Sequence, residues 1–280
     1  MKSNLRKLVL LSIVLFLAIS TVFVSCSKDE QVGPELQLTD EVVVSEDFSG
    51  MVGGFIPSPR EVYEAVPLAI APKLKSTPRT KLLTCPPVGN QGRDGACVGW
   101  GVGYAARSII SGAQTTFSPN YIYNQIKIGD CASGSYPVDA INLVANQGVA
   151  TWSVMPYVDG ECYTQPNQYQ RQNAANYKIR TASRVNIDYN SIRAQIAAGN
   201  PVIVGGRVDQ AFQSLGYNRI LNSVSGQGGG HCYCIVGYYD DYNCFKVMNS
   251  WGSNWATNGF GYVSYDIVGS LFSEAYVMGL

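Results

Sequence analysis

The residues best placed to do chemistry are Cys97, His231 and Asn249. Cys97 follows a glycine-containing turn, Asn90–Ala96, at the start of a segment whose apolar residues repeat with helical spacing. The N-terminus of a helix carries roughly half a positive charge, which favours the thiolate over the thiol. Small neighbours such as Gly95 leave the sulfur accessible. These features predict a nucleophile, and the alternative is an ordinary buried or disulfide-bonded cysteine.

His231 is the only histidine of the chain, which argues against a metal site built from several histidines. Imidazole titrates in the range that a base for a thiol nucleophile needs. His231 follows Gly228–Gly230 and begins a predicted strand. Three glycines indicate that something approaches this backbone closely. The alternative is a histidine with no part in catalysis.

Asn249 lies 18 residues after His231, at the end of a predicted strand. A side-chain amide can accept the imidazole N–H and so fix the tautomer and orientation of the ring. Trp251 would either shield this contact from water or fill the core. The alternative for Asn249 is a turn residue that ends the strand.

The elements expected around these residues are helices first and strands later. The helical segments are Gly95–Ser111, a helix opened by Ser118-Pro119, and Pro137–Asn146. Short apolar or alternating runs typical of strands follow at 201–205, 232–238, 244–248 and 261–265. This order predicts an α+β chain with two unlike halves.

Charge and cysteine content limit the class of protein. The 20 Lys and Arg residues balance the 20 Asp and Glu residues, so nothing in the sequence indicates a nucleic-acid partner. No cofactor is implied. Besides Cys26 and Cys97 there are six cysteines, and the sequence does not choose among their pairings. Cys232 and Cys234 alternate along a predicted strand and could equally be small buried residues.

The N-terminus indicates export. A basic start precedes an apolar run, Leu8–Val24, as in a secretory signal, and the run is a little short for a membrane anchor. Phe23–Cys26 resembles a bacterial lipobox, which would leave Cys26 lipidated, and Ser27–Glu30 resembles the signals that send some Gram-negative lipoproteins to the cell surface. We therefore expect an exported outer-membrane lipoprotein, on the surface or the periplasmic face. Its expected parts are a signal peptide at 1–26, a tether, leader or short propeptide at 27–81, and a globular domain at 82–280.

Three ordered motifs resemble those of papain-like cysteine peptidases. Segments 87–97, 230–238 and 249–262 are similar to the active-site segment, the histidine strand and the asparagine segment of that family. The histidine and asparagine lie 134 and 152 residues after Cys97, near the family spacing of about 130–150. The resemblance implies a papain-like two-lobe fold. A helical lobe would carry the cysteine, and a β-rich, barrel-like lobe would carry the histidine and asparagine.

The resemblance also assigns roles. Cys97 would be the nucleophile, His231 its partner in a thiolate–imidazolium pair, and Asn249 the residue that orients the imidazole. Gln91 would bind the oxyanion together with the Cys97 backbone N–H. Trp251 would cover the His231–Asn249 hydrogen bond.

Two residues depart from the family pattern near the nucleophile. Asp94 stands in place of a disulfide cysteine, and Val98 in place of an aromatic residue. Gly95, between them, would line the cleft. These departures affect substrate preference rather than the catalytic roles.

The implied function is that of a monomeric cysteine endopeptidase, which hydrolyses peptides through an acyl-thioester on Cys97. The absence of a second histidine and the short stretch Asp130–Tyr136 predict an open cleft, unless part of residues 50–80 lies across it. The alternatives are an amidase or transpeptidase with the same thiol, and a non-catalytic binding lipoprotein on the same scaffold.

Overall fold

The computed structural model describes residues 36, 38, 53–225 and 227–280. The chain divides into the units Met1–Gln31 and Val32–Leu280, and the architecture below is that of the second unit. Cys26 and the expected signal peptide lie outside the described residues. Within the described part, no helix has the length and apolar character that crossing a bilayer requires.

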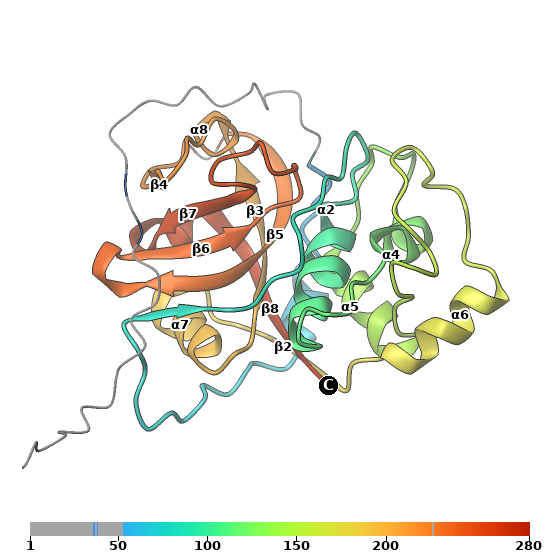
Figure 1. Ribbon diagram of the computed structural model, residues 1–280, viewed down its shortest axis with the longest axis horizontal. Helices are drawn as coiled ribbons and strands as arrows, with labels where there is room; N and C mark the ends of the chain where they lie inside the picture. The colour runs from blue at the N-terminus through green and yellow to red at the C-terminus, as the bar shows by residue number, and fades with distance from the viewer. Residues whose placement is uncertain (1–35, 37, 39–52, 226) are drawn as a thin grey trace, which may run out of the picture. The chain divides into compact units, whose positions relative to one another are not determined.

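The helical lobe follows the leader and is formed by residues 97–177 (Figure 1). Its first helix runs without a break through α2 (Cys97–Gly99), the π-helical η1 (Trp100–Arg107) and α3 (Ser108–Ile110). The helices α4 (Pro119–Ile126), α5 (Pro137–Asn146) and α6 (Gln168–Ala174) and the 3-10 turn η2 (Ala175–Tyr177) complete the lobe. The three helices predicted here are confirmed. Ser118 caps α4 as expected, since its Oγ accepts from the Tyr121 N–H at 3.0 Å.

The β lobe contains one eight-stranded sheet with the order β2-β8-β3-β5-β6-β7-β4, and β1 pairs with β5. The strands are β1 (Thr80–Leu82), β2 (Thr181–Arg184), β3 (Val202–Val208), β4 (Ile220–Leu221), β5 (Gly229–Tyr239), β6 (Cys244–Met248), β7 (Phe260–Ser264) and β8 (Phe272–Gly279). All pairs are antiparallel except β4 with β7. The four strands predicted by pattern are β3, β5, β6 and β7, so the expected α+β division into two lobes is confirmed.

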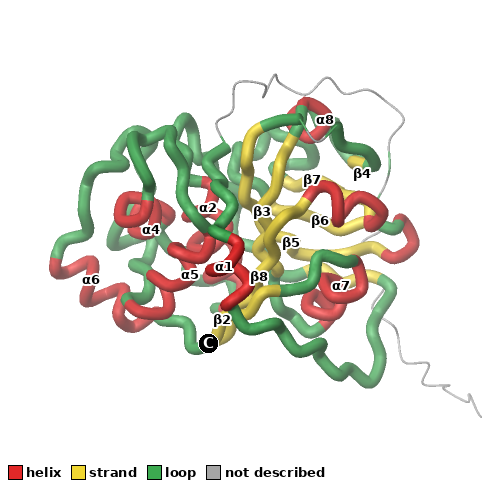
Figure 2. Tube along the Cα trace, turned by 180° about the vertical axis from the view of Figure 1, so that it is seen from behind, coloured by secondary structure: helices red, strands yellow, loops and turns green. Residues whose placement is uncertain are grey.

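Short helices border the sheet and the leader. They are α1 (Arg60–Ala65), α7 (Tyr189–Ala197), α8 (Gln210–Gln213) and α9 (Val268–Leu271), with the 3-10 turns η3 (Asp240–Tyr242) and η4 (Tyr265–Ile267). Figure 2 shows α1 beside β8, where the rings of Tyr63 and Tyr276 meet edge to face at 5.4 Å.

Strand β5 belongs to two apolar cores. Alternate side chains of a strand point to opposite faces. Cys232, Cys234 and Val236 pack into the core shared with the helical lobe, and Tyr233 and Ile235 pack into the core of the β lobe. The strand that carries His231 is therefore held from both sides.

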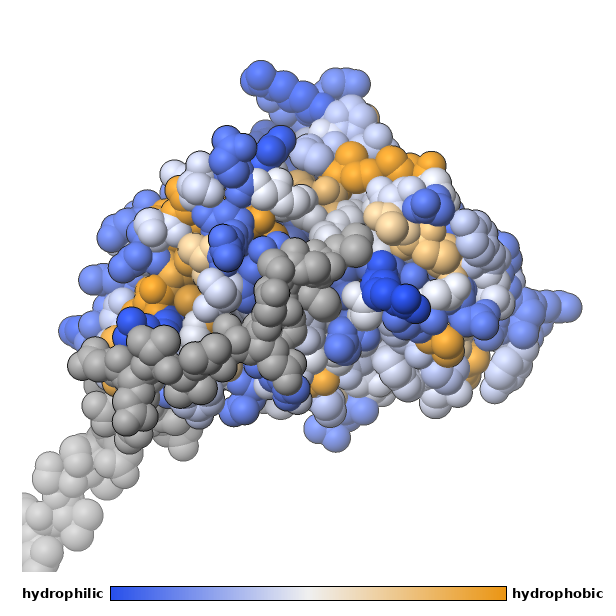
Figure 3. Space-filling model, turned by 90° about the horizontal axis from the view of Figure 1, so that it is seen from above, coloured by the Kyte–Doolittle hydropathy of each residue, from blue (hydrophilic) through white to orange (hydrophobic). Residues whose placement is uncertain are grey.

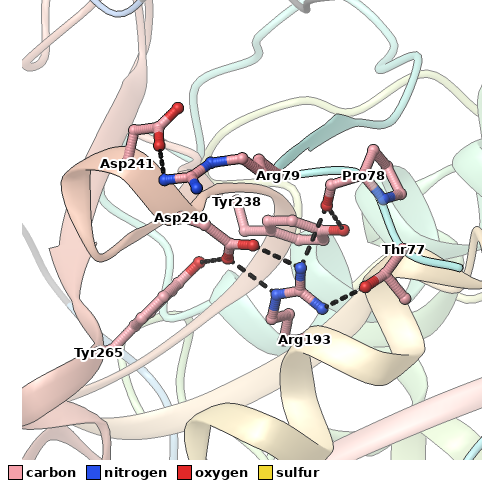
Figure 4. Close-up of polar contacts among 8 residues, drawn as sticks. All are labelled: Thr77, Pro78, Arg79, Arg193, Tyr238, Asp240, Asp241 and Tyr265. Atoms are coloured by element: carbon pink, nitrogen blue, oxygen red, sulfur yellow. Dashed lines mark hydrogen bonds and ion pairs between the residues drawn. The ribbon is translucent and has the colours of Figure 1, made fainter. Parts of the chain in front are cut away.

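The leader is attached to the β lobe upstream of residue 82. Arg184 bonds the backbone at residues 66–69, and its N–H donates to the Pro67 carbonyl at 2.9 Å. Further on, the Arg193 guanidinium donates to Asp240, to Thr77 Oγ1 at 3.0 Å and to the Pro78 carbonyl at 3.1 Å. Figure 4 shows this side chain between the leader and the Asp240 turn.

Between these two attachments, residues 73–76 are exposed, and Ile70 is 89% exposed. On the face drawn in Figure 3, hydrophobic residues form separate groups among polar ones. The leader thus crosses the surface as an exposed loop between two fixed segments.

Candidate active site

Cys97 begins the helix α2 and is fully buried. The turn before it is held to the helical lobe, because the Gly95 N–H donates to the Cys131 carbonyl at 2.7 Å. The Cys97 thiol accepts a hydrogen bond from the backbone N–H of Cys232, the residue directly after His231. The nucleophile of one lobe therefore touches the histidine strand of the other.

His231 lies on β5 opposite Gly206 of β3. Its Nε2 is 2.7 Å from Asn249 Oδ1. That oxygen also accepts the Ser250 backbone N–H at 2.8 Å, so the amide is fixed with its oxygen toward the ring. An oxygen acceptor requires the proton on Nε2, which leaves Nδ1 as the basic nitrogen. Nδ1 is buried and has no hydrogen-bond partner in the described structure.

Trp251 stacks on this imidazole, with the ring centroids 4.5 Å apart and the planes 26° from parallel. Trp251 and Asn249 are both buried. The indole therefore lies against the ring that makes the His231–Asn249 hydrogen bond, where the sequence placed it.

Gln91 directs its side-chain amide toward the same region. Its Oε1 accepts from Ser250 Oγ at 2.7 Å, and its Nε2 donates to the Asp94 carbonyl at 2.9 Å and to the Gly53 carbonyl at 3.2 Å. Ser250 was not identified from the sequence. The Ser250 hydroxyl bonds the Gln91 side chain, and the Ser250 backbone N–H bonds the Asn249 side chain. In the sequence, only its position next to Asn249 could have indicated this role.

Residues 53–58 of the leader, here called the occluding segment, lie across the site. The Gly54 N–H donates to the Gly230 carbonyl at 2.9 Å, and its carbonyl accepts from the Ser135 N–H at 2.8 Å. The Ile56 N–H donates back to the Ser135 carbonyl at 3.2 Å, which makes a parallel bridge between Phe55 and Ser135. The expectation of an open cleft is therefore wrong for this form, and the alternative, a leader lying across the cleft, is correct.

Glycines allow this close approach. A Cβ at Gly53 would lie 1.9 Å from the Gly230 carbonyl oxygen, and one at Gly54, whose φ is +124°, would lie 2.1 Å from the Gly95 carbonyl oxygen. No other residue type fits at such distances. The close approach that the Gly228–Gly230 run predicts is made by the chain's own leader at Gly230 and by the Val208 backbone at Gly228.

Two further leader residues complete the contact. The Phe55 ring packs against Gly205 and Gly230 and is 5% exposed. Ser58 donates from its N–H and its Oγ to the carboxylate of Glu274, which also accepts from the Tyr276 hydroxyl at 2.6 Å. Burial raises the pKa of Glu274. The occluding segment thus provides hydrogen-bond donors to the buried Glu274 carboxylate and also pairs with backbone groups of the enzyme.

Burial keeps the thiol and the imidazole neutral here. It raises the pKa of Cys97 to about 12. It lowers the pKa of His231 to about 4, against a smaller opposing effect of the hydrogen bond to Asn249. Removing both groups from water disfavours their charged forms. In this covered form the thiol and the imidazole are therefore both neutral.

The family's disulfide near the nucleophile is replaced by hydrogen bonds. Asp94 is buried, and its carboxylate accepts from the Gly160 N–H at 3.1 Å and the Tyr157 hydroxyl at 3.4 Å. Cys131 is bonded to Cys162. The remaining described cysteines, which include Cys232 and Cys234, are free. The described residues contain no cluster of side chains suited to hold a metal ion.

We predict that His231 titrates in the full chain with a pKa of about 4. Folding then favours the neutral ring. The stability it contributes is complete above the unfolded pKa near 6.5 and is lost as the pH falls through that value toward 4. The loss amounts to about 3 kcal/mol. Urea unfolding at pH 7 and pH 4 should show this extra loss in the wild type relative to His231→Gln. NMR titration gives the pKa directly, because the chain has a single histidine and its signals need no assignment. A ring that titrates at its ordinary value would contradict the buried geometry.

Comparison with known proteins places this geometry in a family. The family model "Papain family cysteine protease" matches residues 74–276. Chymopapain from Carica papaya is 27% identical over 185 residues, 62% of this chain and 50% of that protein. Papain from the same plant is 26% identical over 202 residues, 68% of this chain and 56% of that protein. The chain spans 26%, 39% and 50% of three of the curated relatives that it matches.

Solved structures agree. Xylellain, a cysteine protease from Xylella fastidiosa, superposes with a TM-score of 0.72 at 25% identity, over 85% of this chain and 99% of that chain. Procathepsin L2 from Tenebrio molitor shares the fold, with a TM-score of 0.67 at 18% identity over 88% and 85% of the two chains. The family model alone spans well over half of the sequence. This chain therefore belongs to the papain family of cysteine proteases.

Proposed function

We propose that the protein is a cysteine endopeptidase that hydrolyses peptide bonds through an acyl-thioester on Cys97. The observation that carries this proposal is the 2.7 Å contact between His231 Nε2 and Asn249 Oδ1. This contact leaves His231 Nδ1 as the basic nitrogen. The next residue of the strand, Cys232, donates its backbone N–H to the Cys97 sulfur. A nucleophile, an oriented base and an orienting amide are the parts that acyl transfer requires.

The reaction follows from these positions. The Cys97 thiol gives its proton to His231 Nδ1, and the sulfur attacks the carbonyl carbon of the peptide. The oxyanion accepts hydrogen bonds from Gln91 Nε2 and the Cys97 N–H. His231 then protonates the leaving amine as the C–N bond breaks. A water molecule gives a proton to the same nitrogen, attacks the thioester and releases the acid and the thiol.

We propose further that the occluding segment keeps the enzyme latent. The Gly53 carbonyl takes the hydrogen bond of Gln91 Nε2 at 3.2 Å, so the donor meant for the oxyanion is in use. Gly54 and Ile56 take both backbone groups of Ser135, a site where an extended substrate could pair. A substrate can enter only when residues 53–58 leave.

The exposed loop at residues 71–76 is the proposed place of cleavage. The leader is fixed before it by Arg184 and after it by Arg193. Strand β1 at Thr80–Leu82 pairs with β5 and belongs to the catalytic domain. A cut in the loop leaves β1 with the enzyme and puts the occluding segment on a separate fragment, which is then held only by its own contacts, those with Arg184 included, and can dissociate.

The export signal supports an envelope location. We propose that Cys26 is lipidated and that the residues after it tether the enzyme to the outer membrane, with peptides or proteins as substrates and with a monomeric enzyme. The support is the basic start, the apolar run and the lipobox-like segment before Cys26. Metabolic labelling with a fatty-acid analogue tests this, and incorporation that persists in Cys26→Ala would contradict it.

The endopeptidase assignment predicts cleavage of a peptide blocked at both ends. With the leader cut at loop 71–76, the wild type should cleave it internally, and Cys97→Ala should lose at least about a thousandfold in kcat/KM. Cys244→Ala, which removes another buried thiol, is the matched control. Cleavage of the uncapped peptide alone would indicate an exopeptidase. Products bearing an added amine in place of water would indicate a transferase.

Latency predicts that activity depends on an intact loop. Trypsin should cut at Lys73 or Lys75, both exposed, and activity should rise on dilution because the released segment no longer has the high local concentration of a tethered one. Lys73→Gln/Lys75→Gln should stay uncut in the loop and inactive. The measurement is peptidase activity against the mass of the fragments. Equal activity of the intact and the cut chain would contradict latency.

A further inference from the structure

A second thiol lies beside the nucleophile. Cys232 is the residue after His231, and its backbone N–H donates to the Cys97 sulfur. Its own Sγ would lie 3.0 Å from a Cβ at Gly101, which is one turn further along the helix that Cys97 begins. The absence of a side chain at Gly101 leaves room for this sulfur on the helix face that carries the nucleophile.

Both thiols belong to the same apolar core, where the first helix of the helical lobe meets strand β5. A small pocket lined by Gly101, Tyr104 and Cys232, among others, adjoins the second thiol. A side chain next to free space can change rotamer without displacing neighbours. A change of the Cys232 rotamer is therefore the movement that would bring its sulfur to Cys97.

We propose that Cys232 is a resolving thiol, which captures an oxidised Cys97 as a Cys97–Cys232 disulfide and so makes peroxide inactivation of the enzyme reversible. The inference goes beyond the proposed function and rests on it only in requiring a reactive Cys97. Both residues are present as free thiols in the described form.

The chemistry balances with a hydroperoxide as the oxidant. The Cys97 thiolate attacks one peroxide oxygen, the O–O bond breaks, and Cys97 becomes a sulfenic acid while hydroxide leaves. The Cys232 sulfur then attacks the Cys97 sulfur, the S–OH bond breaks, and the Cys232 proton leaves with the hydroxyl group as water. External thiols reduce the disulfide and restore both residues.

Position in the fold assigns the two roles. Both thiols are fully buried in this form, but Cys97 lies at the N-terminus of a helix, which favours its thiolate, and Cys232 lies within strand β5. Cys97 gains thiolate character once water and a charged imidazole stand beside it. The proximity of the two sulfurs compensates for the poor intrinsic reactivity of Cys232, because the second step occurs within one molecule.

The test uses the full chain after its leader has been cut in loop 71–76, because Cys97 is a covered, neutral thiol in the intact chain, and the probe is hydrogen peroxide. After exposure the protein is alkylated under denaturing conditions, digested without reduction and mapped by mass spectrometry. The wild type should yield the Cys97–Cys232 linked peptide, and dithiothreitol should return Cys97 to a free thiol. In Cys232→Ala the recovered fraction should fall several-fold, because Cys97 proceeds to the sulfinic acid, which dithiothreitol does not reduce.

Cys234→Ala is the matched control, since this thiol lies two residues further on the same face of β5 and is equally buried. It should behave as the wild type. Equal over-oxidation of Cys97 in the wild type and Cys232→Ala, a link from Cys97 to another cysteine, or a Cys97 that resists peroxide in both proteins would each overturn the proposal. None of these readouts needs peptidase activity, so failure here is distinct from failure of the proposed function.

Discussion

The hydrogen bond between His231 and Asn249 is the interaction to which the rest of the site is fitted. The ring is completely buried and has Trp251 on one face. A single 2.7 Å contact sets which nitrogen carries the proton. Ser250 extends the constraint, since its N–H holds the Asn249 oxygen and its hydroxyl holds Gln91. The orienting residue and the oxyanion donor are thus positioned by one short segment after β6.

The same burial that orders the site disfavours the charged forms of the thiol and the imidazole. With the occluding segment in place, water is excluded, and both the thiol and the imidazole favour their neutral forms. When the segment leaves, water and the field of the helix N-terminus both favour the ion pair. The proposed latency therefore has two parts. The leader takes the hydrogen bonds that a substrate needs. It also keeps the pKa of the Cys97 thiol above that of the His231 imidazole, so the proton stays on the sulfur.

Local chemistry made part of this site predictable. Cys97, His231 and Asn249 could be predicted as a catalytic group because few residue types suit these roles and the helix and strand patterns around them are regular, and the structure brings His231 to Asn249. The contact between Gln91 and Ser250 joins positions 159 residues apart, and no local pattern encodes such a pair. The same holds for Ser58 and Glu274, 216 residues apart. The choice of Cys131 with Cys162 likewise depends on how two loops meet.

The fold shows the same limit. The helix at Pro119 follows from its Ser118 cap, and both this helix and the one at Pro137 begin with a proline in the first turn; the structure agrees with both. The widening of the first helix into a π-helix at Trp100–Arg107 has no signature in the apolar repeat. The glycine run before His231 did indicate a close approach, but the sequence could not show which segment makes it. That segment contains Gly53 and Gly54, whose lack of side chains allows the approach from the other side.

The most direct test of the account is the labelling of Cys97 by a thiol-directed epoxide, followed over time and located by peptide mass mapping. The account predicts slow labelling of the intact chain, rapid labelling of Cys97 alone after the leader is cut, and no rapid labelling in His231→Gln. A reaction at another cysteine, or equal labelling of Cys97 with and without His231, would contradict it.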